Sequence, residues 1–598
     1  MVWRLFVRSK ESEQMEKQVD KKQKLLFMFL ILALVAYVIK NIFVGADVDE
    51  GYGVMIGFRL AMGDKLLLEM WEPHQTSAIF TALFIKPFLW ITGGNVDFLN
   101  VYLRVVYFVI HGVISWGIYR SFLACKKELG KKGAAGLALV FFVCSPKSVF
   151  IPEYSNLHIW FFALLCISLM WYFCAQSPLR GRLWLLAVAG VWLTCDVLAY
   201  PSMALLLPFC LIVFGCQKRN SFWKECLIFI MPCVVGAGIF MGYVFSYMSL
   251  GQLLEVLPYV LGDGSHSQGV TNKLLGYAAN FGVMGLQLIV CGVVAVVVTR
   301  VSGRVKDKGK ETSEANVHGK PRLTEGFVST FLVVFFVVHI VFMFFTWFTH
   351  TYNASYTRLL YLAIALSGVY CYQKTGKKEK AGLYLILLSV VNYCAVLALS
   401  NWNPSLLAPY FIMGALGGLL CWNRYFHEVR AEWSRAVLPI LCGILTVSCC
   451  FGYCFRIIGG ELTPSTIFEI RGINRDGFRK GILANYMTAY RYNSNQDIWA
   501  EAVPEGSTVM YVGMSQFSYM HGGCVVAVPS TISTPTYDET MLAYWKMNPD
   551  RYPDVVVVES CYGDIGAVAE DAFLMEWLEE EFGAAEIIDY PYMRVYKR

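Results

Sequence analysis

Charged residues are scarce in this chain. Asp, Glu, Lys and Arg make up 16% of its 598 residues, against about 25% in a typical soluble domain. This deficit, with a hydrophobic content of 57%, excludes a single soluble core. Apolar stretches of about 20 residues, the length that a membrane-spanning helix needs, recur between residues 25 and 456. The composition therefore predicts an integral membrane protein, and the net charge of +6 gives no sign of a nucleic-acid partner.

Common cofactor and metal motifs are also missing. No Cys or His cluster has zinc spacing, no P-loop is present, and no glycine fingerprint follows the β-rich run at 508–513. Most of the 19 cysteines lie in apolar runs, where a thiol acts as a small hydrophobic side chain. Cys524 and Cys561 lie in a more polar region and could pair. The sequence predicts neither a disulfide framework nor a dinucleotide site.

The distribution of Lys and Arg predicts how the chain crosses the membrane, because positive residues flank spans on the cytoplasmic side. Residues 1–24 are rich in Lys and Arg and are expected inside. A signal peptide ending near residue 46 is the rival interpretation, but the apolar stretch is longer than a usual signal segment and favours an uncleaved anchor. One register of about 13 spans puts every basic loop inside. The predicted spans are 25–44, 100–122, 133–150, 157–175, 183–199, 201–216, 226–249, 282–300, 327–348, 358–372, 381–399, 406–422 and 436–456.

The stretch 45–98 needs a separate interpretation. Residues 78–92 are apolar enough to suggest a span, but a crossing there would place the loop with Lys126 and Lys132 outside. Short helices on the outer face and at the membrane interface avoid this conflict. We therefore predict an outer segment at 45–98 within a membrane domain at 25–456.

The pattern changes to that of a soluble domain in the last part of the chain. Strands alternating with helices indicate a small layered sheet. The predicted fold is an all-α polytopic membrane bundle with an extracytoplasmic α/β domain at 457–598, which is expected to act as a lid or scaffold. Acceptor binding is its alternative role. The predicted strands are 508–513, 524–529, 554–559 and 585–597, and the clearest helix is 565–582.

Carboxylates gather where the chain leaves the first span. Asp49 and Glu50 come first, and Tyr52, Arg59 and His74 follow in the outer segment. A solvated acidic loop is the simplest interpretation. A carboxylate held at the membrane surface can, however, deprotonate a hydroxyl nucleophile if burial tunes its pKa. These residues are therefore candidate catalytic and substrate-binding groups.

Ionisable residues in or beside apolar spans give a second set of candidates, because burial in the membrane is costly for them. Arg104 and Arg358 could each hold a phosphate through paired donors, with snorkelling to the interface as the alternative. Glu153, the acid of the next outer loop, could orient a substrate or assist the first carboxylate. Asp196 could pair with a basic residue or line a cavity, whereas His111 is expected to pack against neighbouring helices.

The order of these features resembles the GT-C class of integral membrane glycosyltransferases, and most of all the branch containing protein O-mannosyltransferases and bacterial lipid A aminoarabinose transferases. That pattern has a first span, an Asp-Glu pair with a nearby Tyr, a short helix, an apolar juxtamembrane helix and an Arg opening the second span. Here Asp49-Glu50, Tyr52, the apolar stretch 76–90 and Arg104 follow the same order. The resemblance covers roughly the first 220 residues and the remainder only in layout.

Two features depart from the family pattern. Pro73-His74-Gln75-Thr76 stands where paired prolines are usual, and the acid at the start of the fourth span is absent unless Glu153 serves. Because of these departures, the resemblance does not assign the role of a second acid.

The resemblance implies an inverting sugar transfer outside the membrane. The donor would be a sugar on a polyprenyl phosphate, and the acceptor a hydroxyl of a glycan, lipid or protein. Asp49 would be the catalytic base, Glu50 would support it or orient the sugar, and Arg104, Arg358 or another basic group would stabilise the lipid-phosphate leaving group. No cofactor is certain, and the carboxylates permit a divalent metal without requiring one. The implied location is the plasma membrane, with the N-terminus in the cytoplasm.

Two other functions stay open on the sequence. A secondary transporter shares the many spans and buried ionisable residues, although transporters often have repeated halves and helices broken at mid-membrane, and no clear repeat is present here. A non-catalytic cell-envelope assembly protein, with the tail as a binding module, is the second.

Overall fold

The computed structural model describes most of the chain. Arg358 and Cys561, and most of the predicted span 327–348, lie outside the described residues. The described residues are 25, 27–45, 48–145, 149–174, 179–216, 221–261, 270–308, 330–331, 333–335, 337–338, 341, 360–400, 404–429, 434–457, 465–513, 516–531, 537–559, 572–582, 586–591 and 593–598.

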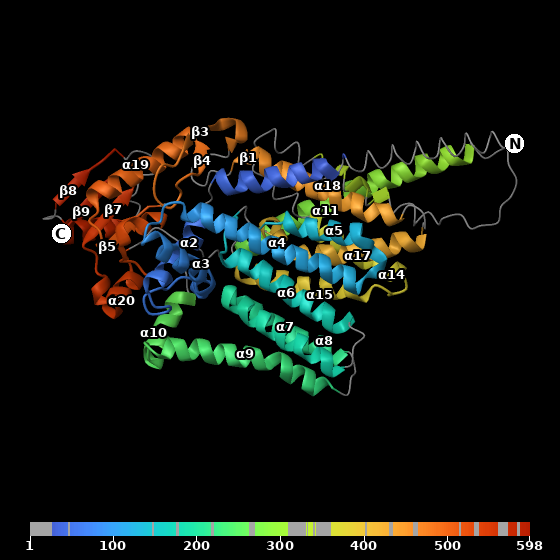
Figure 1. Cartoon of the computed structure of the whole chain (residues 1–598), viewed down its shortest axis with the longest axis horizontal. Helices are drawn as coiled ribbons and strands as arrows, with labels where there is room; N and C mark the ends of the chain where they lie inside the picture. Colours follow the sequence, from blue (N-terminus) through green and yellow to red (C-terminus); the bar gives the residue numbers. More distant parts are fainter. Residues whose placement is uncertain are drawn as a thin grey trace.

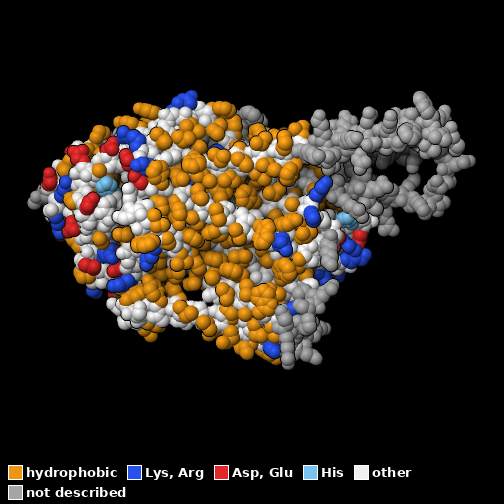
Figure 2. All heavy atoms as spheres, in the orientation of Figure 1, with side chains coloured by type: hydrophobic (Ala, Val, Ile, Leu, Met, Phe, Trp, Pro, Cys, Tyr) orange, Lys and Arg blue, Asp and Glu red, His pale blue; other side chains and the backbone are white. Residues whose placement is uncertain are grey.

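Helices that run side by side along the long axis form the larger part of the molecule (Figure 1). Figure 2 shows hydrophobic side chains covering the middle of the visible face, while Asp and Glu gather mainly at the end that carries the C-terminal domain. The helices of the bundle are Phe27–Phe43, α4 (Leu99–Cys125), α5 (Gly130–Phe142), α6 (Tyr154–Cys174), α7 (Leu179–Ala199), η3 (Pro201–Leu205), α8 (Leu206–Cys216), α9 (Phe222–Phe245), α10 (Leu250–Leu261), α11 (Val270–Lys308), α14 (Leu360–Lys374), α15 (Lys380–Leu399), α16 (Pro404–Leu407), η5 (Ala408–Phe411), α17 (Ile412–Val429) and α18 (Ser434–Phe455).

Within the described part of the chain, seven helices are long and apolar enough to cross a membrane. They confirm a polytopic helical membrane protein, while the finer count of about 13 spans stays a prediction. The helix Phe27–Phe43 is apolar but shorter. The seven candidate spans are Leu99–Cys125, Tyr154–Cys174, Arg182–Ala199, Phe222–Phe245, Thr271–Val301, Lys380–Ala398 and Leu438–Phe455.

Two predicted span boundaries are wrong. The span predicted at 133–150 ends as a helix at Phe142, because Pro146 disfavours helical backbone at the residue before it. Of the residues between α5 and α6, the described ones, 143–145 and 149–153, are not helical. The helix over the predicted span 282–300 begins earlier than predicted, at Val270.

Glycine allows α17 to approach its neighbours closely. A Cβ on Gly418 would lie 2.5 Å from the Ile364 carbonyl oxygen of α14, and one on Gly417 would lie 2.5 Å from the Gly382 carbonyl oxygen of α15. Side chains at these positions would push the helices apart. Small residues at helix crossings are typical of packing within membranes, where close backbone contact replaces the hydrophobic effect.

Segments predicted on the same side of the membrane meet in the structure. At one end of the bundle, Lys126 Nζ lies 2.5 Å from Glu379 Oε1, so two loops predicted inside are joined. At the other end, the Tyr247 hydroxyl donates to the Leu66 carbonyl (2.9 Å), and the Asn100 amide donates to the Phe478 carbonyl (3.1 Å). The direction of the bundle across a membrane stays a prediction.

The outer segment consists of short helices beside the C-terminal domain (Figure 1). α2 (Val48–Met62) is followed by the turn η1 (Gln75–Ser77) and by α3 (Ala78–Thr92). α2 packs along α3 and also contacts the turn η7 (Gln516–Gly523) of the C-terminal domain. Neither α2 nor α3 is among the candidate spans.

The C-terminal domain contains a five-stranded mixed sheet with strand order β6-β5-β7-β9-β8. β5 pairs in parallel with β6 and β7, whereas β9 is antiparallel to β7 and β8. The predicted run at 585–597 is thus two strands of a hairpin. The bounds are β1 (Arg456–Ile457), β2 (Ser465–Thr466), η6 (Ile467–Glu469), β3 (Ile470–Ile473), β4 (Leu483–Asn485), α19 (Tyr486–Ala502), β5 (Thr508–Val512), β6 (Val525–Val526), α20 (Glu539–Met547), η8 (Pro549–Arg551), β7 (Val555–Glu559), α21 (Ala572–Phe582), β8 (Glu586–Asp589) and β9 (Met593–Lys597).

Candidate active site

The first turn of α2 contains a buried ion pair between Glu50 and Arg104. Arg104 Nε donates to Glu50 Oε1 (3.1 Å) and Arg104 Nη2 to Glu50 Oε2 (2.5 Å). The exposed fractions are 0% for Glu50 and 2% for Arg104. A guanidinium that meets both oxygens of a carboxylate in this way gives a strong pair with a fixed orientation. The pair therefore locks the start of α2 against α4.

Arg104 also binds the end of the helix Phe27–Phe43. Its Nη1 donates to the carbonyls of Asn41 (3.0 Å) and Ile42 (3.2 Å), and its Nη2 donates to the carbonyl of Gly45 (2.6 Å). The last carbonyls of a helix lack partners within it, so a cation there is favourable. Arg104 thus joins three segments, and all of its nitrogens donate to protein oxygens.

Asp49 precedes the locked glutamate and is half-buried in the same first turn of α2. Consecutive helical residues point in directions about 100° apart, so fixing Glu50 also fixes where Asp49 points. The amides of a helix N-terminus favour a carboxylate there. The structure thus gives the two predicted acids different surroundings, one buried in an ion pair and the other reaching the surface.

A row of aromatic rings leads from α2 into the bundle. The Tyr52 and Tyr154 rings lie edge-on with centroids 6.2 Å apart. His74 stacks on Tyr154 at 4.0 Å with its ring tilted by only 4°, and its other neighbour Tyr200 is 5.1 Å away. The structure therefore brings together the predicted site residues Tyr52 and His74, through Tyr154 of α6 and Tyr200, the residue before η3.

Glu153 caps the start of α6. Its Oε2 accepts from the amide of Ser155 and its Oε1 from the amide of Asn156, both at 3.0 Å. A Cβ on Gly53 would lie 2.6 Å from the Glu153 Cβ, so a glycine in α2 lets this loop approach. Side-chain oxygens at a helix N-terminus satisfy amides that lack partners within the helix. Glu153 thus adjoins α2 and helps to hold the loop that carries Tyr154.

Arg59, at the last turn of α2, lies in a second buried charge cluster. Its Nε donates to Asp64 Oδ2 (2.7 Å), its Nη1 to Glu72 Oε1 (2.9 Å) and its Nη2 to the Glu69 carbonyl (2.5 Å). Burial lowers the pKa of Arg59, but the charges of Asp64 and Glu72 outweigh it and hold the pKa above its usual value. The predicted substrate-binding arginine is thus fully engaged with its own segment.

The same cluster binds the C-terminal domain. Thr531 donates to Glu72 Oε1 from its amide (3.0 Å) and its hydroxyl (2.9 Å), and Arg551 Nη2 lies 3.0 Å from Asp64 Oδ1. Burial raises the pKa of Glu72, while the charge of Arg59 and the hydrogen bonds of Thr531 oppose the shift. These contacts fix the outer segment to the C-terminal domain.

The structure gives no test of a bound metal. Among the described residues, no group of three or more His, Cys, Asp or Glu side chains is arranged to hold one. A divalent metal beside Asp49 stays a prediction, as does the phosphate-binding role of Arg358.

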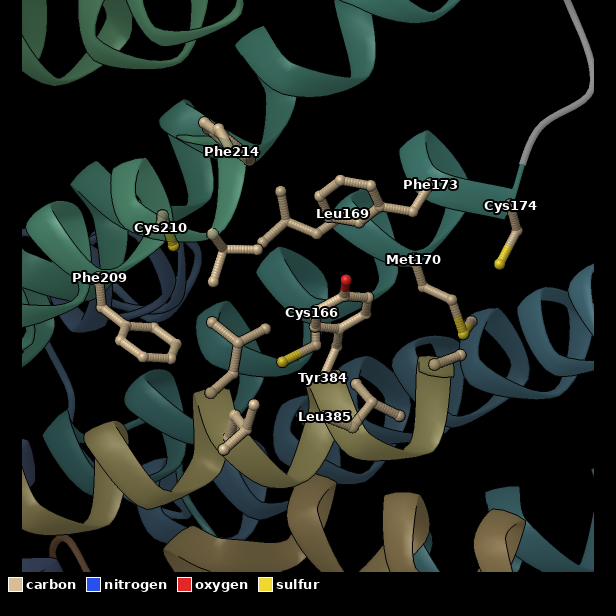
Figure 3. A pocket seen from close by; sticks show the side chains of 14 residues that line it. Cys166, Leu169, Met170, Phe173, Cys174, Phe209, Cys210, Phe214, Tyr384 and Leu385 are labelled. Atoms are coloured by element: carbon tan, nitrogen blue, oxygen red, sulfur yellow. The ribbon is translucent and has the colours of Figure 1, made fainter. Parts of the chain in front are cut away.

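An apolar cavity lies between α6, α8 and α15, and Figure 3 shows Phe173, Phe209 and Tyr384 among its lining side chains. Cys166, the first lining residue on α6, is 12 positions after Tyr154. That spacing corresponds to about 18 Å along the helix. The cavity is therefore separate from the carboxylates of α2.

Comparison with solved structures finds similar proteins. One is ArnT from Cupriavidus metallidurans bound to undecaprenyl phosphate, with 11% identity, a TM-score of 0.44, and coverage of 96% of this chain and 98% of that chain. Another is the Archaeoglobus fulgidus oligosaccharyltransferase in complex with Zn and sulfate, with 10% identity, a TM-score of 0.42, and coverage of 89% and 67%. Both are glycosyltransferases of the GT-C class, which is the class that the sequence resembles. Neither a protein-family model nor a curated protein sequence matches this chain.

Because these identities are low and the TM-scores are below 0.5, function is inferred from the residues of this chain. Two features of the site escaped the sequence. One is the Glu50–Arg104 pair, whose partners are 54 positions apart. The other is the hydrogen bond between Glu72 and Thr531, whose partners are 459 positions apart.

Proposed function

We propose that this protein is a membrane glycosyltransferase that moves a sugar from a polyprenyl-phosphate donor to an acceptor hydroxyl, with inversion. One observation carries the proposal. The Glu50–Arg104 pair fixes the start of α2 so that the neighbouring Asp49 reaches the surface beside Tyr52. A positioned carboxylate beside aromatic rings is suited to take a proton from a hydroxyl next to a sugar ring.

Asp49 is proposed as the catalytic base. It takes the proton of the acceptor hydroxyl while that oxygen attacks the anomeric carbon. The bond between the anomeric carbon and the phosphate oxygen breaks on the opposite face, and its electron pair leaves with the lipid phosphate. A single displacement of this kind inverts the anomeric carbon. A base within hydrogen-bond reach typically accelerates such a step by about 100-fold to 10,000-fold.

Glu50 and Arg104 are proposed as positioning residues. Both side chains are buried, and the donors of Arg104 are directed to Glu50 and to three carbonyls. This departs from the expectation that Arg104 holds the lipid phosphate. Arg358 keeps that role as a proposal. Tyr52, His74 and Glu153 are proposed to shape the substrate site through the aromatic row and the loop before α6.

The C-terminal domain is proposed to act as a scaffold on the outer face. The contacts of Arg551 with Asp64 and of Thr531 with Glu72 are buried or nearly so, which suits a permanent attachment better than a moving lid. The proposed location is the plasma membrane, with the N-terminus in the cytoplasm and the residues after about 457 outside. The donor lipid would be of the same class as the undecaprenyl phosphate in the ArnT structure.

The proposal is tested by sugar transfer with the purified full chain in lipid nanodiscs. The donors are a panel of polyprenyl-phosphate sugars and, as a control, the corresponding nucleotide sugars. We expect transfer from one or more lipid donors alone and a product whose anomeric configuration, read by NMR, is inverted. Transfer with retention, or from nucleotide sugars alone, would exclude the proposed reaction. Parallel assays with EDTA and with added Mg²⁺ or Mn²⁺ decide whether a divalent metal is needed.

A different assay distinguishes the proposed transferase from a transporter. Protein in sealed vesicles would carry its substrate across the membrane without forming a glycosidic bond. Flux of an unmodified sugar or lipid with no transfer product would favour that alternative.

A further inference from the structure

A buried histidine and aspartate form a pair inside the bundle, on helices other than α2. His158 of α6 and Asp196 of α7 are both 0% exposed, and His158 Nδ1 lies 2.7 Å from Asp196 Oδ1. Ionisable groups within membrane spans are costly, so they are retained mainly where they serve a function. The carboxylate fixes the ring orientation and keeps a proton on Nδ1.

The other polar atoms of this pair have no partner among the described residues. They are His158 Nε2 and Asp196 Oδ2, and the Ser155 hydroxyl, one turn earlier on α6, is in the same state. A buried polar atom without a partner costs free energy and calls for an explanation. The hydrogen bond at His158 Nδ1 is short and well placed, so we interpret the unused Nε2 as a group that binds a ligand.

His111 of α4 is a buried histidine that packs within the bundle and serves as a comparison for His158. It is also buried in a span, but its Nε2 donates to the Phe141 carbonyl (3.1 Å) and its Nδ1 accepts from Trp160 Nε1 (2.8 Å). Its ring stacks on Tyr107 and Phe141. Both nitrogens are satisfied, as expected from the sequence. His158 differs in that its Nδ1 meets a carboxylate and its Nε2 has no partner among the described residues.

The aromatic row connects this pair to Asp49. Tyr52 of α2 and Tyr154 of α6 are in contact. Asp49 lies three positions before Tyr52, and His158 lies four positions after Tyr154, so each is about one helical turn from that contact on the same face. The Tyr200 ring lies 5.4 Å from the His158 ring and 6.2 Å from the Tyr154 ring. The two tyrosines therefore link the turn that carries Asp49 to the turn that carries His158.

We propose that His158, oriented by Asp196, binds the phosphate of the polyprenyl phosphate carrier. This rests on the proposed function. When the imidazole carries both protons, Nδ1–H donates to Asp196 and Nε2–H is directed to a phosphate oxygen. The Ser155 hydroxyl supplies a second donor on the same helix face. Arg104, the basic residue first expected in this role, is held by Glu50 and by carbonyls.

The proposed reaction sets how far the phosphate donor should lie from the base. In this reaction the base, the acceptor oxygen, the anomeric carbon, a phosphate oxygen and its donor follow one another. Ordinary hydrogen-bond and near-attack distances between them add up to about 10 Å. Asp49 would receive the proton of the acceptor at one end. At the other end, the electron pair of the broken bond stays on the lipid phosphate, and the Nε2–H hydrogen bond stabilises the charge that it gains. No further reactant is needed.

The test measures binding rather than turnover. The purified full chain in nanodiscs is titrated with undecaprenyl phosphate and with undecaprenol, which lacks the phosphate, and the ratio of the two affinities gives the phosphate preference. We expect wild type to prefer the phosphate, and His158→Gln to lose about 10-fold or more of that preference, as for a hydrogen bond to a charged group. Asp196→Asn keeps an acceptor for Nδ1 but not its charge, and should lose less.

His111→Gln is the matched control. It should lower thermal stability yet keep the phosphate preference. Folded His158→Gln with the wild-type preference would overturn the inference. If that variant does not fold, Asp196→Asn decides, and a wild-type preference there overturns it equally. A wild-type protein that binds neither lipid, or both equally, would instead contradict the proposed lipid-phosphate donor.

Discussion

The two ends of α2 use the same interaction for different purposes. At the first turn, Arg104 holds Glu50 against the bundle. At the last turn, Arg59 holds Asp64 and Glu72, and these acids also bind Arg551 and Thr531 of the C-terminal domain. Both clusters are buried.

Their difference is in what each cluster leaves at the surface. The last turn binds another domain, whereas the first turn leaves the half-buried Asp49 beside the locked glutamate. A buried Arg–carboxylate pair therefore does not mark a catalytic site by itself. The half-buried carboxylate next to it, which is proposed to act on the substrate, is what distinguishes the first turn.

The largest expected effect is on activity, from Asp49→Asn. This change removes the proposed base and leaves the Glu50–Arg104 pair intact. We expect sugar transfer to fall by about 100-fold to 10,000-fold, with an unfolding midpoint close to that of wild type. The measurement is initial transfer rate together with thermal unfolding of the same preparation.

Asp97→Asn is a control for that prediction. Asp97 is also an acid near the C-terminal domain, where it accepts from Lys480 (2.7 Å) and from the Gly477 amide (2.7 Å). Its substitution should change transfer little. Equal losses in the two variants would contradict a special role for Asp49.

The next effect is on stability, from Arg104→Gln. Removing one partner of a buried pair leaves an uncompensated charge and costs about 3–5 kcal/mol. We expect chemical unfolding to show a loss in that range, and transfer to fall with it because Asp49 is no longer held in place. The double variant Glu50→Gln with Arg104→Gln should be more stable than the sum of the single losses. Additive losses would mean that the two residues do not act as a pair.

A smaller effect is expected at the other end of α2, from Arg551→Met. This change removes the ion pairs with Asp64 (3.0 Å) and Glu69 (3.3 Å) but leaves the Arg59 pairs in place. We expect a loss of about 1–3 kcal/mol and faster hydrogen exchange at the contact between residues 64–72 and the C-terminal domain. Unchanged exchange would contradict the scaffold role of that contact.

The smallest effect is a pH dependence at His521, which lies in the turn η7. Burial lowers the pKa of His521. The folded state therefore resists protonation that the unfolded chain accepts, so this contribution to stability is present above the usual pKa of about 6.5 and is lost as the pH falls below it. Wild type and His521→Gln should unfold alike at pH 7.5, and wild type should lose more stability at pH 5.5. If wild type and His521→Gln lose stability equally between pH 7.5 and pH 5.5, His521 is not the cause of the pH dependence.

Much of the layout could be predicted from the sequence because its signals are local. The apolar runs predicted α4, α6, α7 and α15 to within a few residues, and the acids after the first span marked the start of α2. The assignment of 45–98 to the outer face came from the positions of Lys126 and its neighbours, and it stays a prediction. In the C-terminal domain, β5 and β7 lie where the β-rich runs predicted them.

The partners of the site residues could not be predicted because they depend on the fold. Arg104 was expected to meet a phosphate, and only the packing of α4 on α2 shows that it meets Glu50. His158 attracted no attention in the sequence, since its partner Asp196 is on another helix. The end of α5 at Phe142 was missed because apolar composition outweighed the effect of Pro146 in the prediction.

The central claim is that Asp49, and not Glu50, acts on the substrate. A structure of the full chain with a polyprenyl-phosphate sugar bound tests it most directly. We predict that the Glu50–Arg104 pair persists and that an Asp49 oxygen lies on the acceptor side of the sugar, with room for the acceptor hydroxyl between it and the anomeric carbon. A structure in which Glu50 leaves Arg104 and takes that position, with Asp49 directed away from the sugar, would contradict the account.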